Sequence, residues 1–328
     1  MASVRASGVA DAASAVAAAP VPVGRAPARR LLRTRKTRRT VLVWCFLAPS
    51  LAIFLLYRVL PLMWNGVLSF QKWSPYRAPS WGGLMHYEEM FFYDDVFWTA
   101  LWNTLIFMAS APVGIALALG VAILVNADIR GRDVYRTLVF LSYPLMTVAV
   151  GIIWRWLYDE RVGLINYTLQ SFGLIDRPIA FLQSFTWALP AVIAASIWQT
   201  LGFYMIILLT GLQNIPQNLY EAAAVDGVGR WPQFWRITLP LLRPSLFLCC
   251  IIGILNSFTS FDLVYVMTNG GPGRATELLV TYVYKLGFVQ TQFDYAAAVT
   301  VVQFLLLLAL AWLANRATGG NAGAIERD

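Results

Sequence analysis

The sequence contains few charged residues. Only 13% of its 328 residues are Asp, Glu, Lys or Arg, whereas soluble domains usually contain about 25%. In contrast, 59% of the residues are hydrophobic, and the mean hydropathy is +0.61. The apolar residues fall into long runs separated by short polar stretches, so the composition indicates a membrane protein.

Histidine, lysine and cysteine are also scarce, and their absence excludes several kinds of chemistry. His86 is the only histidine, which leaves almost no material for histidine-based metal sites or catalytic triads. No lysine follows a glycine, so a Walker-type phosphate loop is impossible. The cysteines lie in apolar runs without metal-ligand or disulfide spacing: Cys45, Cys249 and Cys250. We therefore predict no enzymatic activity, no cofactor and no metal site in this chain.

Six apolar runs are long enough to cross a membrane. A spanning helix needs about 20 apolar residues to cross roughly 30 Å of hydrocarbon, and a helix satisfies all backbone groups within one segment. The sequence therefore predicts an all-α polytopic membrane protein with six transmembrane helices. The predicted spans are 41–63, 99–125, 138–157, 187–210, 245–267 and 296–314.

The distribution of basic residues predicts the orientation of these spans. With both termini in the cytoplasm, 17 Lys and Arg residues fall in the cytoplasmic segments and six in the outer ones. Because basic residues accumulate on the cytoplasmic side of spans, we expect both termini to be cytoplasmic. The net charge of +8 thus indicates contact with membrane lipid and predicts no nucleic-acid partner.

The two ends of the chain are predicted to be cytoplasmic tails, at 1–40 and 317–328. Eight Lys and Arg residues lie between Arg25 and Arg39, and such clusters lie against anionic lipid headgroups. The basic cluster follows the weakly apolar N-terminal stretch, which is the reverse of a processed leader, so we expect a disordered tail. The outer segment 81–98 mixes aromatic and acidic residues and predicts an amphipathic helix at the interface.

The segment 211–244 predicts a helical elbow between the fourth and fifth spans. Pro216 opens the first helix, where its missing N–H does no harm. Gly227 ends this helix with a residue that tolerates positive φ. We expect a second helix from about Trp231 to Leu239, which Pro240 then breaks.

Residue types and spacings in this elbow match a known motif over some twenty residues. The matching residues are Glu221, Ala222, Ala223, Asp226, Gly227, Ile237, Leu239 and Pro240. They resemble the EAA loop of permeases from binding-protein-dependent ABC importers, with Val228 standing where alanine is more usual. In that family the loop couples the permease to its ATPase. The alternative interpretation is an ordinary amphipathic linker.

Further segments resemble the carbohydrate-uptake branch of this family. They are Asn103-Thr104, Asn269 to Pro272 and Phe293 to Ala298, and the resemblance covers residues 41–316. Within this branch, the chain is similar to the first-subunit permeases for glycerol-3-phosphate and disaccharides. The resemblance implies a transmembrane domain over 41–316 in the bacterial inner membrane. It also implies a homologous second permease as heterodimer partner, two cytoplasmic ATPase subunits that bind ATP and Mg, and an extracytoplasmic solute-binding protein.

Polar residues within the spans are candidates for the solute path, because they are costly in lipid unless they face protein or water. Hydroxyls and amides both donate and accept hydrogen bonds, as sugar hydroxyls require, and aromatic rings suit the apolar faces of sugars. The alternative is that these groups join packed helices. The candidates are Gln199, Tyr204, Asn256, Ser257, Ser260 and Asp262.

The candidate path favours a sugar or sugar-like solute without identifying it. The spans contain no arginine cluster, so glycerol-3-phosphate or another sugar phosphate is the less favoured alternative. Asp262 is the single acid within a predicted span, whereas ion-coupled secondary carriers need several ionisable groups in the membrane. A carrier of that kind or a membrane scaffold is therefore a remote alternative.

The predicted orientation can be tested by labelling engineered cysteines in intact cells with a membrane-impermeant reagent. Cysteines near Arg130 and Arg230 should be shielded, and cysteines in the 268–290 loop should react, because the basic residues place these segments on opposite sides. Strong labelling at position 230 from outside would contradict the predicted orientation.

Overall fold

The computed structural model describes residues 28–75, 77–128 and 130–317, which are mostly helical. The chain divides into two compact units, Met1–Pro61 and Leu62–Asp328, which are described separately. Most of the predicted tails lie outside the described residues. Residues 28–40, predicted to be disordered, belong to a helix instead, since strong helix formers such as Arg, Leu and Lys predominate there.

The first unit is one long helical segment. Helix α1 (Ala28–Phe54) continues into a π-helical turn, η1 (Leu55–Val59), and the next helix, α2, covers Leu60–Leu68. The stretch Thr40–Leu68 is long and apolar enough to cross a membrane. Its large apolar side chains are exposed, as expected for a helix whose surroundings are lipid.

A short β-hairpin follows α2, so the prediction of an all-helical chain is wrong for this segment. Strand β1 (Gln71–Ser74) pairs antiparallel with β2 (Arg77–Trp81), with Gln71 opposite Trp81. The Phe70 ring stacks on Trp81 with centroids 6.0 Å apart. Cross-strand aromatic contacts of this kind stabilise hairpins, and Pro75, which follows β1, favours a turn.

The outer segment predicted as one amphipathic helix over 81–98 is divided between two helices. Helix α3 (Met85–Phe92) ends before Asp94, and α4 (Asp95–Ala109) begins after it. The Asp94 Oδ1 accepts hydrogen bonds from the backbone N–H groups of Val96 (2.8 Å) and Phe97 (3.1 Å). This N-cap satisfies two otherwise unpaired donors and fixes the start of α4.

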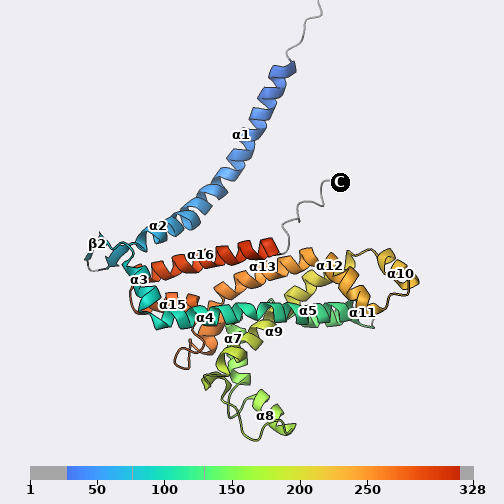
Figure 1. The fold of residues 1–328 in the computed structure, drawn as a ribbon. Helices are drawn as coiled ribbons and strands as arrows, with labels where there is room; N and C mark the ends of the chain where they lie inside the picture. Colours follow the sequence, from blue (N-terminus) through green and yellow to red (C-terminus); the bar gives the residue numbers. More distant parts are fainter. Residues whose placement is uncertain (1–27, 76, 129, 318–328) are drawn as a thin grey trace, which may run out of the picture. The chain divides into compact units, whose positions relative to one another are not determined.

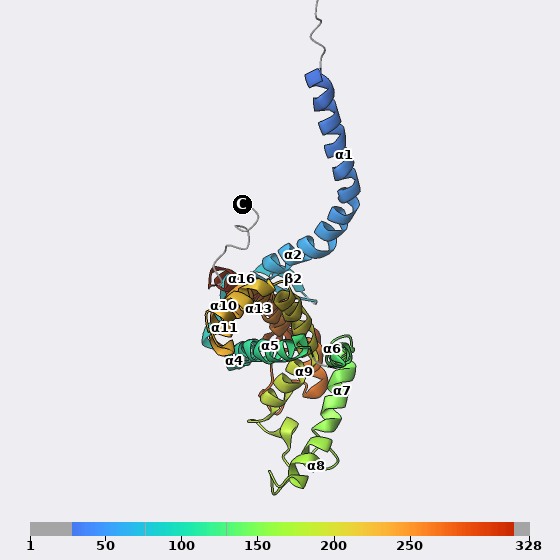
Figure 2. The same ribbon diagram turned by 90° about the vertical axis from the view of Figure 1, so that its right-hand side faces the viewer.

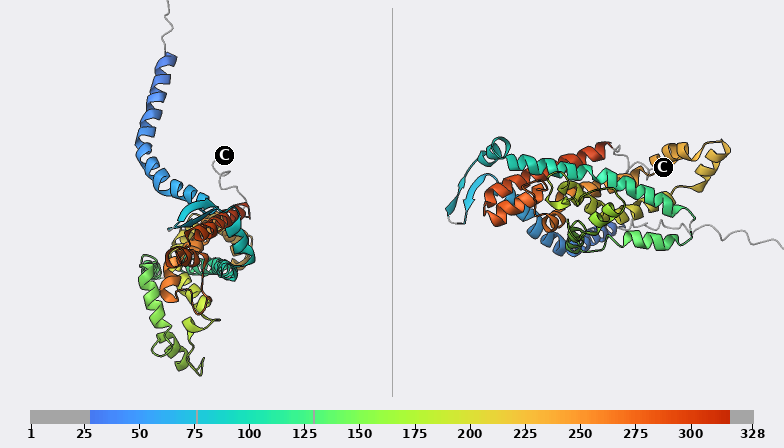
Figure 3. Two further views of the ribbon diagram at one scale, coloured as in Figure 1. Left: turned by 90° about the vertical axis from the view of Figure 1, so that its left-hand side faces the viewer. Right: turned by 90° about the horizontal axis from the view of Figure 1, so that it is seen from below.

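The second unit is built on long helices: α4 and α5 follow each other in one run, and α13 lies between this run and α16 (Figures 1 and 2). Helix α10 (Gln217–Val225) lies at one end of this unit and the β-hairpin at the other (Figure 3). The main helices after α4 are α5 (Ala111–Asn126), α9 (Ala188–Gln213), α13 (Arg243–Thr259) and α16 (Phe293–Ala317). Shorter elements complete it: α8 (Leu164–Ser171), η2 (Phe181–Gln183), α15 (Leu279–Tyr284) and the π-helical η4 (Lys285–Val289).

The third predicted span, 138–157, is not a continuous helix. Helix α6 (Arg132–Phe140) is separated from α7 (Thr147–Leu157) by a turn that contains Pro144. Proline lacks an N–H donor and disfavours helical backbone at the residue before it. The prediction of one continuous span over 138–157 is therefore wrong. It was based on the apolar composition of the segment, which does not change at the break.

The fifth predicted span, 245–267, is broken as well. Helix α13 ends at Thr259, and α14 (Phe261–Met267) starts after Ser260, whose ψ of 63° is not helical. Among the described residues, four helices are long and apolar enough to cross a membrane, or five if one bent pair counts as a single span. These are fewer than the six predicted.

Close contacts at small residues hold α9 against its neighbours. A Cβ on Gly202 would lie 2.4 Å from the carbonyl oxygen of Val139, so glycine lets α9 approach the α6 backbone closely. On another side, Gly114 of α5 packs on Ile197 of α9. Small residues at such crossings are typical of helices that associate in membranes, where dispersion contacts replace the hydrophobic effect.

Asn103 and Thr104 anchor the loop after α14 to the middle of α4. The Asn103 Nδ2 donates hydrogen bonds to the carbonyl oxygens of Arg274 (3.2 Å) and Glu277 (3.0 Å). The Thr104 Oγ1 accepts one from the backbone N–H of Leu279 (3.0 Å). Asn103-Thr104, one segment that carries the resemblance to carbohydrate permeases, is therefore joined to the residues that follow another of them, Asn269 to Pro272.

We predict that Asn103→Ala destabilises the protein by about 1–3 kcal/mol, because two carbonyl groups, one of them in a buried hydrogen bond, lose their donor. The thermal unfolding midpoint of the detergent-purified protein should fall. Thr99→Ala, on the exposed side of the same helix, is the matched control and should leave the midpoint nearly unchanged. Equal midpoints for both variants would show that the joint contributes nothing to stability.

Candidate functional site

The elbow predicted for 211–244 begins with helix α10 (Gln217–Val225), whose N-cap is Pro216. The positive φ predicted for Gly227 is confirmed, at 75°. The backbone N–H of Val228 bonds to the Ala223 carbonyl oxygen (2.9 Å) around this turn. A left-handed residue with such a hydrogen bond is a common way to end a helix, and glycine adopts it without strain.

The second arm of the elbow is a helical run in three parts: α11 (Arg230–Gln233), the π-helical η3 (Phe234–Thr238) and α12 (Leu239–Leu241). Pro240 does not break this run as predicted, because it lies in the first turn of α12, where its missing N–H is tolerated. The chain instead bends by 66° at residue 242, between α12 and α13.

The two arms are tied to each other by polar side chains. The hydroxyl groups of Tyr220 and Thr238 are hydrogen-bonded at 2.9 Å. The Gln233 Nε2 donates a hydrogen bond to the Val228 carbonyl oxygen at 2.8 Å. These contacts fix the angle of the elbow without any contribution from the motif residues on α10.

The motif residues divide by exposure into two groups. Glu221, Ala222, Asp226 and Gly227 are exposed, and Ala223 is half-buried. The second group is partly buried where the second arm meets the bundle: Ile237, Leu239 and Pro240. The exposed surface of α10 therefore combines small side chains with two carboxylates, which suits close contact with another protein.

The base of the elbow is packed tightly against the long helices. A Cβ on Gly211 of α9 would lie 2.4 Å from the Ser245 Oγ and 2.8 Å from the Leu242 Cδ2. Leu242 is fully buried in the cluster formed with α5 and α9. Because these contacts leave no free space, a displacement of the elbow must move α9 and α13 with it.

A cavity of about 400 Å³ lies where α7, α9, α13 and α14 meet. It collects four of the six candidates for the solute path, namely Gln199, Asn256, Ser260 and Asp262. Thr200 and Thr259 add two hydroxyl groups to the same cavity. Side chains that donate and accept hydrogen bonds therefore gather at one place.

The other two candidates do not line this cavity. Tyr204 and Ser257 are each 3% exposed and lie in the packed core. The Ser257 Oγ donates a hydrogen bond to the Gly253 carbonyl oxygen (2.8 Å), which leaves the hydroxyl satisfied within its own helix. Ser257 is buried because it lies on the face of α13 that packs against other helices.

Both broken spans end at this cavity, and the sequence prediction missed that connection. The Gln199 Nε2 donates hydrogen bonds to the Leu145 carbonyl oxygen (3.2 Å) and the Thr147 Oγ1 (3.3 Å), next to the break at Pro144. The break at Ser260 forms another wall. Irregular backbone at membrane depth is tolerated where it lines a cavity or is buried in protein. A proline within a predicted span was thus the signal for the missed lining residues Tyr143, Leu145 and Thr147, whereas Ser196 on α9 had no such signal.

Comparison with known proteins finds relatives among the membrane components of transport systems. Residues 110–318 match the family of binding-protein-dependent transport system inner membrane components. The chain is 33% identical over 324 residues to the diacetylchitobiose uptake system permease protein NgcF of Streptomyces coelicolor, covering 92% of this chain and 91% of the relative. It is 34% identical over 277 residues to the lactose transport system permease protein LacF of Rhizobium radiobacter, covering 82% and 91%.

The fold is also found in a solved transporter. The chain resembles a subunit of a bacterial alginate ABC transporter, crystallised in complex with an alginate pentasaccharide-bound periplasmic protein. The TM-score is 0.75 at 25% sequence identity, and the match covers 87% of this chain and 96% of the other.

Proposed function

Because this chain belongs to the family of binding-protein-dependent transport system inner membrane components, we propose that it forms half of the translocation path of an ATP-driven importer for a sugar or sugar-like solute. As a permease, it is a non-catalytic subunit. The named relatives that transport diacetylchitobiose and lactose support a sugar as solute.

One observation carries the proposal: two of the four helices that line the cavity, α9 and α13, also hold the elbow. Gln199 lies 14 residues before the end of α9 at Gln213, which is about 21 Å along the helix. Asn256 lies 13 residues after the start of α13 at Arg243, about 20 Å along that helix. Packed helices act as rigid rods, so movement of the elbow changes the cavity between them.

This geometry supports alternating access as the mechanism. In the proposal, ATP-dependent closure of two cytoplasmic ATPase subunits, which bind ATP and Mg, displaces the elbow through the exposed face of α10. The displacement biases a two-state equilibrium between outward-open and inward-open cavities. A homologous second permease completes the path, and a solute-binding protein delivers the solute to the outer loops. Such a protein is present in the alginate transporter complex.

The cavity chemistry favours a solute without a phosphate group. Asp262 is the one charged side chain among the described residues that line the cavity. A negative charge there disfavours glycerol-3-phosphate or another sugar phosphate through Coulomb repulsion. Hydroxyl and amide side chains, in contrast, match the hydrogen-bonding needs of a neutral sugar.

The basic residues support placement in the bacterial inner membrane with both termini in the cytoplasm.

We predict different outcomes for leucine substitutions at two neighbouring serines. Ser260→Leu should leave the protein folded and reduce ATP-dependent uptake, because it fills the cavity and removes a hydroxyl group. Ser257→Leu should lower the yield of folded protein, since overpacking a core costs about 1–3 kcal/mol. The measurements are uptake by proteoliposomes of the complete transporter and the unfolding midpoint. Normal uptake by Ser260→Leu would remove this cavity from the solute path.

We also predict that Gly227→Pro uncouples the transporter. Proline fixes φ near −65°, whereas Gly227 has a φ of 75°, so the turn cannot form and α10 should no longer reach its partner. Solute-stimulated ATP hydrolysis in proteoliposomes and co-purification of the ATPase subunits should both be lost, while membrane insertion is retained.

Gly229→Pro is the matched control for this experiment. Gly229 lies two residues further along the same turn, and its φ of −65° is compatible with proline. This variant should keep its stimulated ATP hydrolysis. Full stimulation in Gly227→Pro would contradict the coupling role of the elbow.

A further inference from the structure

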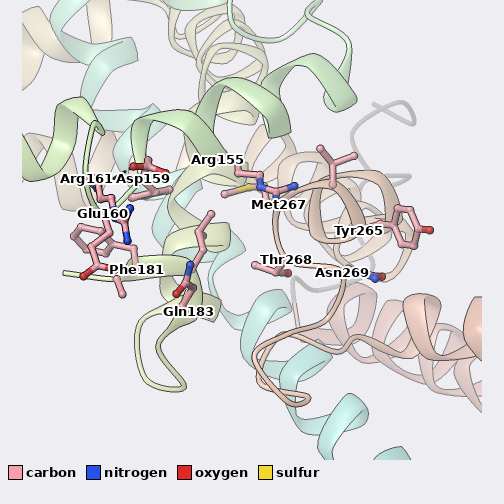
Figure 4. Close-up of a pocket in the computed structure, with 14 residues that line it drawn as sticks. Arg155, Asp159, Glu160, Arg161, Phe181, Gln183, Tyr265, Met267, Thr268 and Asn269 are labelled. Carbon is pink, nitrogen blue, oxygen red and sulfur yellow. Dashed lines mark hydrogen bonds between the residues drawn. The ribbon is translucent and has the colours of Figure 1, made fainter. Parts of the chain in front are cut away.

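A second polar pocket, of about 510 Å³, lies at the opposite end of α7 from the cavity (Figure 4). One side of it is formed by the loop after α7, with Asp159, Glu160 and Arg161, and by Phe181. The other side is formed by the C-terminal end of α14 and the residues that follow it. Figure 4 shows Arg155 and Gln183 between these two sides. Within the described chain, this pocket is distinct from the cavity and shares no lining residue with it.

The walls of this pocket are held in place by partly buried hydrogen bonds. The Asn166 Nδ2 donates to the carbonyl oxygens of Asp159 (3.2 Å) and Ile179 (2.9 Å), and its Oδ1 accepts from the Ile179 N–H (2.9 Å). Across the pocket, the hydroxyls of Thr268 and Thr276 are bonded at 2.7 Å. A site whose walls are fixed before binding loses less conformational entropy when a ligand arrives.

The pocket and the cavity are joined by the same two helices. On α7, Thr147 lines the cavity and Arg155 the pocket, which is eight residues or about 12 Å along the helix. On α14, Phe261 to Leu263 face the cavity and Tyr265 to Met267 the pocket. The two helices are in close contact, since a Cβ on Gly151 would lie 3.0 Å from the Val266 Cγ1. The pocket therefore lies next to the cavity, on the side that the basic residues place outside.

The side chains of this pocket suit a neutral, polyhydroxylated ligand. Two guanidinium groups and two carboxylates cancel in charge, and Gln183 adds an amide that donates and accepts. The Asp159 Oδ1 accepts from the N–H groups of Arg161 (2.8 Å) and Val162 (2.9 Å). The bonds from Val162 and Arg161 lower the pKa of this carboxyl group, so it is an ionised acceptor at neutral pH. The Phe181 ring offers an apolar surface for a sugar ring.

We propose that this outer pocket is a second solute site, where a neutral sugar released from the binding protein is held before it enters the cavity. The inference rests on the proposed transport function and adds a binding step to it. Planar groups that bond two neighbouring hydroxyls at once, as Arg, Asp and Gln side chains can, give the pocket its selectivity for sugars. Loss of the site should slow transfer into the cavity without preventing assembly of the complex.

The test is protection of an engineered cysteine from a membrane-impermeant maleimide. The variant Ala180→Cys, at a lining residue to which no sugar contact is assigned, is labelled in the presence of lactose or diacetylchitobiose, in the complete transporter in proteoliposomes without binding protein. Both sugars should slow labelling several-fold, whereas glycine betaine at equal osmolarity should not, because it has no hydroxyl groups. Gln170→Cys, an exposed residue on α8 of the same outer segment, is the matched control and should react equally fast in all solutions. When the substitution Arg161→Gln is added to the variant with the pocket cysteine, the sugars should protect that cysteine less.

Each other outcome overturns the proposal. Absence of protection by both sugars, or equal protection at Gln170→Cys, would show that the pocket holds no sugar. Protection by the empty binding protein alone would identify the pocket as a protein contact instead. ATP-dependent uptake is measured in the same proteoliposomes with binding protein added, so failure of this site and failure of the transport function are distinguishable.

Discussion

The structure depends on the rule that a backbone polar group inside a membrane must find a partner within the protein. Long helices satisfy this rule without help, and most of the described chain uses them. The exceptions are the breaks near Pro144 and Ser260, which leave backbone groups without helical partners. Both breaks occur where α7, α9, α13 and α14 meet, and Gln199 supplies a donor to the first. The cavity thus lies where the helices are interrupted.

The position of the elbow has the same origin. A break within a span separates the helix into a part that can move and a part that stays with its neighbours. Below the breaks, α9 and α13 remain continuous to the elbow, with close packing at Gly211. Helices α9 and α13 therefore join the elbow to the cavity without a break between Gln199 and Gln213 or between Arg243 and Asn256. The proposed alternating access requires packed elements of this kind with discrete arrangements.

Particular residues show how much of this could be predicted from the sequence. Hydrophobic runs located the long helices, and Gly227 located the turn of the elbow, because both follow from local chemistry. The hairpin was missed because a strand of four or five residues gives only a weak alternation of apolar and polar side chains. The break at Pro144 was missed because the length of the apolar run was given more weight than the proline within it. Asn256 and Ser257 are adjacent and equally polar, yet only Asn256 reaches the cavity, and this difference depends on how α13 is rotated against its neighbours. Such rotation is set by tertiary packing and is not encoded in composition.

A common principle connects the loops, the cavity and the outer pocket. Asn103 holds the loop around residues 274–277, Asn166 holds the loop between residues 159 and 179, and Gln199 holds the break before α7. Each is a buried amide that donates to at least one backbone carbonyl group of an irregular segment. An amide can satisfy such groups without the desolvation cost of a buried charge. A chain with so few charged residues can therefore hold irregular segments in place with neutral amide groups.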